Sequence, residues 1–193
     1  MNTLKAEKRD MSVKAKRLRR EGYVTGNVFG REIEGSIPVK IEKNAAEKLL
    51  KTNGKGSQIL LDVDGAVHNV LIKEVQYDSM KNQIDEMDFQ ALVKGEKVHS
   101  TAEIFLLNHE MVNTGVVQQL LHEVAYRADP AHLVDKIEVD VVGMKAGDII
   151  KVKDLAIAKD ENIDLQTDPE ADVATVTEVH AAPEAEEETE ENA

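Results

Sequence analysis

The chain has 193 residues, of which 41% are hydrophobic, and it contains no cysteine, no tryptophan and a formal net charge of -13. This composition allows one large core or two domains of about 90 residues each, and it excludes disulfides and thiolate metal sites. Residues 1–97 carry 18 Lys and Arg against 15 Asp and Glu (+3), whereas residues 98–193 carry 6 against 22 (-16). One end of the molecule therefore suits contact with a polyanion, and the other does not.

A dense cationic segment, Lys14–Arg20, lies near the start of the chain, and we call it the basic block. Residues 1–22 hold eight Lys and Arg against three acidic residues, which gives +5. Five positive charges within seven residues repel one another, and a phosphate backbone relieves that repulsion by neutralisation and counterion release. The alternative is one solvated face of a short helix, with Leu18 as its only large apolar residue. We favour nucleic-acid contact, although the spacing does not identify which nucleic acid.

Between the basic block and residue 93, strand and turn signals follow one another. The glycines just after the block fit neither a dinucleotide-binding loop nor a P-loop, so we predict strand and turn there. Asp64-Gly65 separates two apolar segments, which predicts a hairpin with a two-residue type I′ turn. Strands are predicted for residues 37–41, 59–63, 67–72 and 84–93, and a helix for residues 43–51.

Two of these strands carry finer predictions. Pro38 favours an edge position for residues 37–41, because proline cannot donate to a ladder. Alternation along residues 84–93 assigns one set of side chains to the core and the other to the open face. The inward set is Met87, Phe89 and Ala91, and the open set is Glu86, Asp88 and Gln90.

The second half of the chain predicts short strands that begin after a turn and a domain boundary at Lys94–Lys97. Strands are expected at residues 98–107, 137–142, 149–152 and 173–179, while residues 116–126 are ambiguous between strand and helix. Residues 178–193 hold seven Glu and no Lys or Arg, which predicts a disordered acidic tail. The first eight residues lack the apolar segment of a signal peptide, and no apolar run could span a bilayer. We therefore expect a cytoplasmic protein.

The histidines form no catalytic or metal-binding motif. His109-Glu110 and His122-Glu123 each lack a second His one helical turn later, and Gly56-Ser57-Gln58 lacks the second glycine of a nucleophile elbow. We expect surface or hairpin histidines, no metal, no cofactor and no enzymatic activity. The alternative, a hydrolase that uses His and Glu of the second half, has only the histidine count in its favour.

Several short motifs occur in a characteristic order: Ala6–Arg9, the basic block, Arg20–Val24, Gly30, Val70–Gln76, Met87–Phe89, Ile137–Val141 and Gly147–Val152. Together they resemble the bacterial large-subunit ribosomal protein family that binds 5S ribosomal RNA (L twenty-five in the standard series), in its two-domain general-stress Ctc form. The resemblance implies a mainly β fold with a few helices. It further implies that residues 1–94 form a small β-barrel that docks on loop E of 5S rRNA, that residues 95–180 form a β-rich domain over the subunit surface, and that residues 181–193 are the disordered acidic tail.

The resemblance also implies partners and contact residues. The partners are 5S rRNA, the large ribosomal subunit and, through the second domain, neighbouring ribosomal proteins, with a monomer expected off the ribosome. The implied RNA contacts are Arg9, Lys14, Lys16, Arg17, Arg19, Arg20, Phe29, Gln76 and Asp88.

Three departures from the family pattern, at Thr25, Phe29 and Glu86, support a second interpretation. Thr25 lies in a stretch, Val24–Gly30, that lacks the family's usual Pro-Ala pair. Phe29 stands where the family usually has Tyr, and Glu86 stands where it usually has His. Glu86 adds a carboxylate to Asp85 and Asp88, and like charge there should weaken phosphate binding. The second interpretation is a divergent paralogue with the same fold, a stress-related interaction protein whose rRNA binding is weakened.

Overall fold

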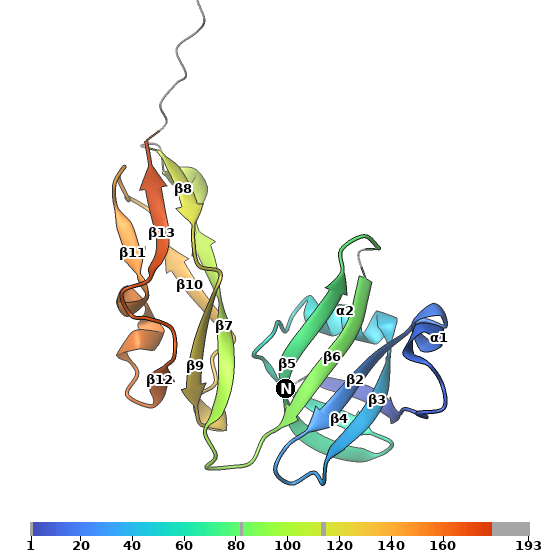
Figure 1. Ribbon diagram of the computed structural model, residues 1–193. Helices are drawn as coiled ribbons and strands as arrows, with labels where there is room; N and C mark the ends of the chain where they lie inside the picture. The colour runs from blue at the N-terminus through green and yellow to red at the C-terminus, as the bar shows by residue number, and fades with distance from the viewer. Residues whose placement is uncertain (1, 82, 113–114, 179–193) are drawn as a thin grey trace, which may run out of the picture.

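The computed structural model describes residues 2–81, 83–112 and 115–178. The fold is mainly β with a few helices, as predicted, and it consists of a β-barrel followed by two further sheets (Figure 1). The acidic tail, residue 179 of the predicted last strand and His180 lie outside the described residues. Within the described part of the chain, no helix is long and apolar enough to cross a bilayer.

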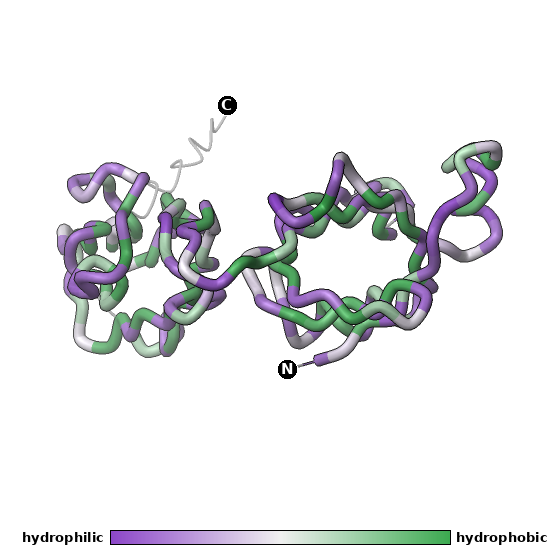
Figure 2. The backbone as a smooth tube through the Cα atoms, turned by 90° about the horizontal axis from the view of Figure 1, so that it is seen from below, coloured by the Kyte–Doolittle hydropathy of each residue, from purple (hydrophilic) through white to green (hydrophobic). Residues whose placement is uncertain are grey.

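Six strands close into the barrel in the order β1-β3-β2-β6-β5-β4, which Figure 2 shows as a ring. Their bounds are β1 Thr3–Lys8, β2 Tyr23–Phe29, β3 Ser36–Glu42, β4 Gln58–Val63, β5 Ala66–Asp78 and β6 Gln83–Ala91. The β1–β4 and β2–β6 pairs are parallel, and the other pairs are antiparallel. Closure leaves no free sheet edge in this part of the molecule.

The barrel is filled by the inward side chains of its strands, because successive strand residues point to opposite faces. Val24, Val28 and Phe89 are completely buried in one core cluster. Helix α2 (Lys43–Leu50), close to the predicted 43–51, packs its buried residues Ala46 and Leu49 onto that cluster. The core therefore positions the outer faces of β2, β5 and β6 on a rigid support.

The predicted hairpin is confirmed. Strands β4 and β5 pair with Val63 opposite Ala66, so that Asp64 and Gly65 form a two-residue turn. Asp64 has φ 50° and Gly65 has φ 91°, and a type I′ turn requires positive φ at both positions.

One finer strand prediction is wrong. The strand of Pro38 is not an edge, because β3 lies between β1 and β2. Proline has no N–H to donate, but on the side of β1 the ladder already ends with Lys8 opposite Val39. Proline is therefore tolerated there, and its carbonyl accepts from the amide of Arg9, in the loop after β1. On β6, Met87 and Phe89 are buried as predicted, and Ile84 is buried as well, because the β5–β6 register shifts between Gln76 and Tyr77. That bulge leaves Asp85 without a register partner on β5 and reverses the alternation of inward and outward side chains along β6.

The second part of the chain follows the turn at Lys94-Gly95 and has two sheets around one core. The four-stranded sheet has the order β10-β7-β9-β12, and the three-stranded sheet has the order β11-β13-β8. The strands are β7 Val98–Leu107, β8 Val116–Gln119, β9 Glu123–Ala128, β10 Lys136–Asp140, β11 Ile149–Lys151, β12 Ile163–Leu165 and β13 Asp172–Thr177. The ambiguous segment 116–126 therefore contains one complete strand and the beginning of the next.

Short 3-10 helices connect these strands: η1 His109–Met111, η2 Pro130–His132, η3 Val152–Asp154 and η4 Ala156–Lys159. Tyr126 is completely buried in the second core. Its hydroxyl donates to the carbonyl of Val134 at 2.7 Å and accepts from the amide of Val134 at 2.8 Å. Burial raises the pKa of Tyr126, so the phenol stays neutral and both bonds persist at ordinary pH.

Polar contacts join the barrel to the second part next to the connecting segment. Lys55 forms an ion pair with Glu123 at 2.9 Å, and the hydroxyl of Ser57 donates to Asp135 at 2.9 Å. Lys73 donates to the carbonyl of His99 at 2.7 Å. Burial, and then the nearby charge of Lys55, lower the pKa of Lys73. These contacts connect β5 and the loop before β4 to β7, to β9 and to the loop before β10.

Candidate nucleic-acid interface

The basic block forms helix α1 (Ala15–Arg20), which precedes β2. Lys14 is its extended N-cap residue and makes no side-chain cap. The three cations Arg17, Arg19 and Arg20 lie in the last turn, where positive charge interacts favourably with the negative end of the helix dipole. Gly22 ends the helix with φ 89°, and its amide bonds the carbonyl of Arg19. A six-residue helix is marginal alone, so tertiary contacts must hold it.

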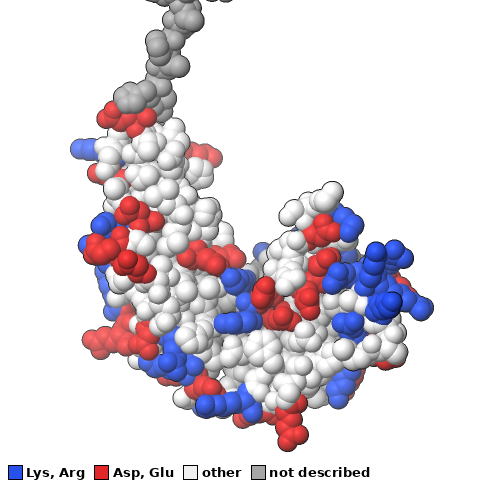
Figure 3. Space-filling model, viewed as in Figure 1, with Lys and Arg blue, Asp and Glu red and all other residues white. Residues whose placement is uncertain are grey.

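Four of the five cations of the basic block face solvent, and one apolar side chain of the block faces the barrel. Leu18 is 6% exposed and is the only buried residue of α1, and the helix contacts β2. The exposed cations are Lys14, Lys16, Arg17 and Arg20. Figure 3 shows Lys and Arg gathered over α1 at one end of the barrel, far from the second part of the molecule. Helix α1 therefore presents exposed positive charge to solvent while its buried side packs on the barrel.

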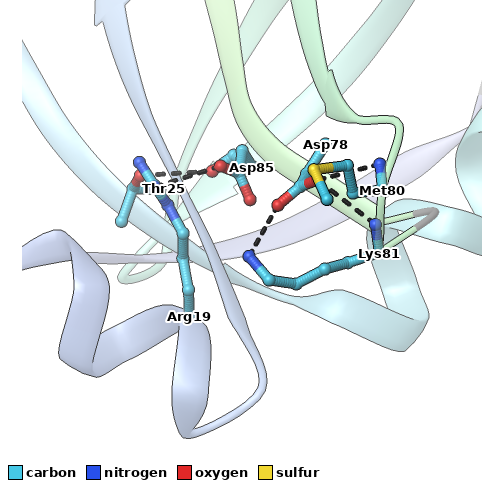
Figure 4. A network of polar contacts seen from close by, with 6 residues as sticks. All are labelled: Arg19, Thr25, Asp78, Met80, Lys81 and Asp85. Atoms are coloured by element: carbon cyan, nitrogen blue, oxygen red, sulfur yellow. Dashed lines mark hydrogen bonds and ion pairs between the residues drawn. The ribbon is translucent and has the colours of Figure 1, made fainter.

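Arg19 differs from the other cations because it turns toward the barrel (Figure 4). Its Nη1 lies 3.1 Å from Oδ2 of Asp85, and the two side chains are 33% and 27% exposed. Its Nε is buried and has no hydrogen-bond partner within the described part of the chain. Asp85 is the bulge residue of β6, and its carbonyl accepts from the hydroxyl of Thr25 at 3.4 Å. Arg19 thus ties α1 to β6, across β2.

Arg9 supports the loop before the helix. It is half-buried, and its Nη2 donates to the carbonyl of Val13 at 3.2 Å, while its amide bonds Pro38. Its Nε is buried without a partner among the described residues. Arg17 has a local partner instead, Glu21 one turn later at 2.8 Å, and this hydrogen bond raises the pKa of Arg17.

The predicted strand residues Gln76 and Asp88 lie on neighbouring strands, on the outside of the barrel. Gln76 is exposed and stands opposite Glu86, which in turn stands opposite Thr25. Asp88 is half-buried, and its Oδ1 accepts from the backbone amide of Asn27 at 3.0 Å and from its side-chain amide at 3.3 Å. Asp88 therefore connects β6 to β2, and its second oxygen is the one left for an outside donor.

Phe29 does not join the basic block. It is half-buried at the last position of β2, opposite Gln90, whereas α1 precedes the first position, Tyr23. Six strand residues span about 20 Å, so Phe29 lies far along the barrel from the helix. Among the predicted residues, Arg19 contacts Asp85. Gln76 lies next to Glu86 on β6, which lies next to Thr25 on β2.

Asp85 is the site residue that sequence reasoning missed, because it counted there only as part of an acidic cluster. The signal was present in the spacing of Ile84 and Met87. Two apolar residues three apart can both be buried in a strand only if the alternation breaks between them. Glu86 remains half-buried and makes no side-chain hydrogen bond or ion pair within residues 2–81, 83–112 and 115–178.

No metal centre forms in the described part of the chain. Residues 2–81, 83–112 and 115–178 contain no group of three His, Asp or Glu side chains arranged to hold an ion. Four of the histidines, His99, His109, His122 and His132, are exposed, and His68 is half-buried on the β5 hairpin strand.

The fold and the surface define a two-part, mainly β protein with a cationic helix on its barrel and an acidic second part. Comparison with family models matches residues 4–89 to the ribosomal L25p family and residues 97–180 to the C-terminal domain of ribosomal protein TL5. The chain is 32% identical over 177 residues to a protein of Thermoanaerobacter sp. (strain X514), which covers 90% of this chain and 87% of the relative. A protein of Listeria monocytogenes serotype 4b is 33% identical over 190 residues, or 96% and 88%.

Both relatives carry the name large ribosomal subunit protein bL25, as does a protein of Bacillus velezensis that is 32% identical over 180 residues, or 91% of this chain and 88% of the relative. The chain therefore belongs to the ribosomal L25p family, in its long form with both matched regions. This is a family of ribosomal structural proteins and not of enzymes, and the hydrolase alternative is excluded.

Proposed function

We propose that this chain is a structural constituent of the large ribosomal subunit, binds 5S rRNA and so supports translation in the cytoplasm. The large subunit is the assembly named for its relatives. The observation that carries the RNA proposal is the basic block, an exposed cationic helix on the outside of the barrel in a chain of net charge -13. An acidic protein has no general reason to concentrate cations on one helix.

The parts of the chain have separate roles in this proposal. Residues 1–94 are the RNA-binding domain, residues 95–180 lie over the subunit surface, and residues 181–193 remain off the RNA as an acidic tail. Residues 98–178 carry 6 basic and 16 acidic residues, a net charge of -10 that is unfavourable beside RNA phosphates. The second domain therefore contacts neighbouring ribosomal proteins in this proposal. Off the ribosome the chain is a monomer.

Phosphate contacts supply most of the affinity. Lys14, Lys16, Arg17, Arg20 and the half-buried Arg19 meet the RNA backbone, and Arg9 supports the loop that leads into them. Double-helical RNA is recognised largely by shape and by phosphate and 2′-hydroxyl contacts, which an exposed cationic helix can provide without reading bases. With about five phosphate contacts, log K falls with log salt with a slope of roughly -4 to -5.

The strand face supplies the polar contacts. Gln76 donates and accepts at a base edge or a 2′-hydroxyl. Asp88 accepts from exocyclic amines or guanine N–H groups through the oxygen that Asn27 does not use. Phe29 keeps an aromatic ring for stacking but lacks the phenolic hydroxyl of a tyrosine.

The test is a titration of labelled 5S rRNA with the full chain, followed by fluorescence anisotropy between 50 mM and 300 mM KCl. Saturable binding with the salt slope above supports the proposal. A 5S rRNA with its loop E replaced by a regular duplex is the control, and it should bind at least tenfold more weakly. Absence of saturable binding to intact 5S rRNA at 50 mM KCl would contradict the proposal.

A second function is favoured by one observation, the half-buried carboxylate of Glu86 beside Gln76, which has no hydrogen-bond or ion-pair partner among the described residues. A negative charge there opposes phosphate, so the chain would be a stress-related interaction protein of the same fold with weakened rRNA binding. Glu86→His should then raise 5S rRNA affinity about tenfold, as one hydrogen bond to a charged group does. Unchanged affinity would remove this second candidate.

A further inference from the structure

We propose that Asp85 is a positioning residue for RNA binding, which holds Arg19 in the orientation that the RNA requires. The proposal rests on the RNA-binding function above and adds a residue to it. It is contrary to simple electrostatics, because a carboxylate beside a cationic helix should weaken the attraction of a polyanion. The geometry gives Asp85 a different role from that of its acidic neighbours.

Arg19 depends on Asp85 because its environment offers little else. The side chain of Arg19 is two-thirds buried, and its buried Nε has no acceptor within the described residues. A buried cation without a partner is strongly disfavoured. The ion pair with Asp85 at 3.1 Å therefore holds the head of Arg19 against the barrel. Without it, Arg19 would swing outward to become another mobile surface cation.

Asp85 is itself fixed on two sides. It is the extra residue of the β5–β6 bulge, and its carbonyl accepts from Thr25 on β2. Just beyond it, Asp78 accepts from the amides of Met80 and Lys81 and pairs with Nζ of Lys81 at 2.6 Å (Figure 4). That pairing holds residues 79–81 against the end of β5. The anchor of Arg19 is thus part of the rigid barrel and not of a loose loop.

The position of Arg19 joins the two halves of the proposed interface. The exposed cations lie on α1, and the polar residues lie on the face of β5 and β6. Arg19 reaches from the helix to the residue next to Glu86, and so brings a positive charge to the edge of the strand face. A guanidinium has five N–H donors, and the one bond to Asp85 leaves donors for a phosphate. Holding the side chain in place removes the ordering cost that a free arginine bears on binding.

The test compares two neighbouring carboxylates, each of which is neutralised in the full chain. Asp85→Asn should weaken 5S rRNA binding about 3- to 10-fold, the effect of releasing one long side chain. Glu86→Gln removes the same charge one residue away, but Glu86 has no partner within the part of the chain that the structure describes, so this change should leave binding unchanged or tighten it a few-fold. A loss of affinity on Asp85→Asn that the equal change of charge in Glu86→Gln does not cause supports the proposal.

Two further variants separate positioning from a general effect on folding. Asp85→Glu keeps the carboxylate and should restore binding to within about 2-fold of the unchanged chain, since an ion pair tolerates one added methylene better than loss of charge. In an Arg19→Ala background, Asp85→Asn should cause no further loss, as the coupling in a double-mutant cycle requires. Thermal unfolding of each variant identifies any that is misfolded, and the Arg19→Ala pair then decides.

The results that overturn the proposal are distinct from those that overturn the function. If the unchanged chain binds and Asp85→Asn binds equally or more tightly, Asp85 does not position Arg19. The same conclusion follows if Asp85→Asn weakens binding equally with and without Arg19. If the unchanged chain does not bind 5S rRNA at 50 mM KCl, both the function and the positioning role are wrong.

Discussion

Removal of three exposed cations from the basic block should reduce both the affinity for 5S rRNA and its dependence on salt. The variant is Lys16→Gln, Arg17→Gln and Arg20→Gln, which leaves five cations against three acidic residues in segment 1–22 and lowers its charge from +5 to +2. All three side chains are exposed, so each change should cost at most about 0.5 kcal/mol of stability. Leu18 and the Arg19–Asp85 pair, which hold the helix, remain.

The magnitude follows from the number of phosphate contacts. Five contacts give a slope of about -4.5 in log K against log salt, and two give about -1.8. If the affinities converge at 1 M salt, the difference of about 2.7 predicts on the order of 500-fold weaker binding at 0.1 M. Anisotropy titrations of labelled 5S rRNA at four salt concentrations measure both quantities.

A matched control removes the same amount of charge elsewhere. Arg127, Lys145 and Lys159 are exposed cations of the second part, and their combined change to Gln should leave the slope unaltered. An equal fall in affinity for both triple variants would refute the reasoning, because it would mean that only net charge matters. An unchanged slope in the block variant would refute it as well.

Three predictions concern stability. Gly26→Ala should destabilise the barrel by about 3 kcal/mol or more, since its Cβ would overlap the backbone oxygen of Met87; a change below about 0.5 kcal/mol in urea unfolding would contradict this. Tyr126→Phe should cost about 1–3 kcal/mol, because both backbone groups of Val134 lose a buried partner, and a neutral result in the same assay would be evidence against it. Hydrogen bonds from two lysines lower the pKa of Glu170 to about 2, so its contribution is present above about pH 4.5 and is lost toward pH 2. Glu170→Gln should therefore lower Tm at pH 7 and have a much smaller effect at pH 2; a pH-independent difference would disprove that linkage.

The strands that alternate regularly could be predicted from the sequence, since burial on one face imposes a period of two. The hairpin at Asp64-Gly65 had both the alternation and the turn residues. Strand β1 was not predicted, because its exposed Lys and Glu residues leave only Leu4 and Ala6 as an inward signal. Its position depends on parallel pairing with β4, which is a long-range contact.

The candidate site was predictable in its charge and not in its arrangement. Five cations in one segment identify the basic block without any structure. The sequence alone does not reveal that Arg19 turns inward while Arg20 faces solvent, because that depends on which side of a six-residue helix meets the barrel. The role of Asp85 depends on a bulge, and Asp88 proved to bond Asn27 through a pairing between distant strands.

The central claim is that the chain joins the large subunit through 5S rRNA, and co-sedimentation with purified subunits tests it most directly. Large subunits assembled with and without 5S rRNA would be pelleted with the chain at 50, 150 and 500 mM KCl. The account predicts near-stoichiometric association that requires 5S rRNA and is released as salt rises. Equal association with subunits that lack 5S rRNA, or none at 50 mM KCl, would contradict it.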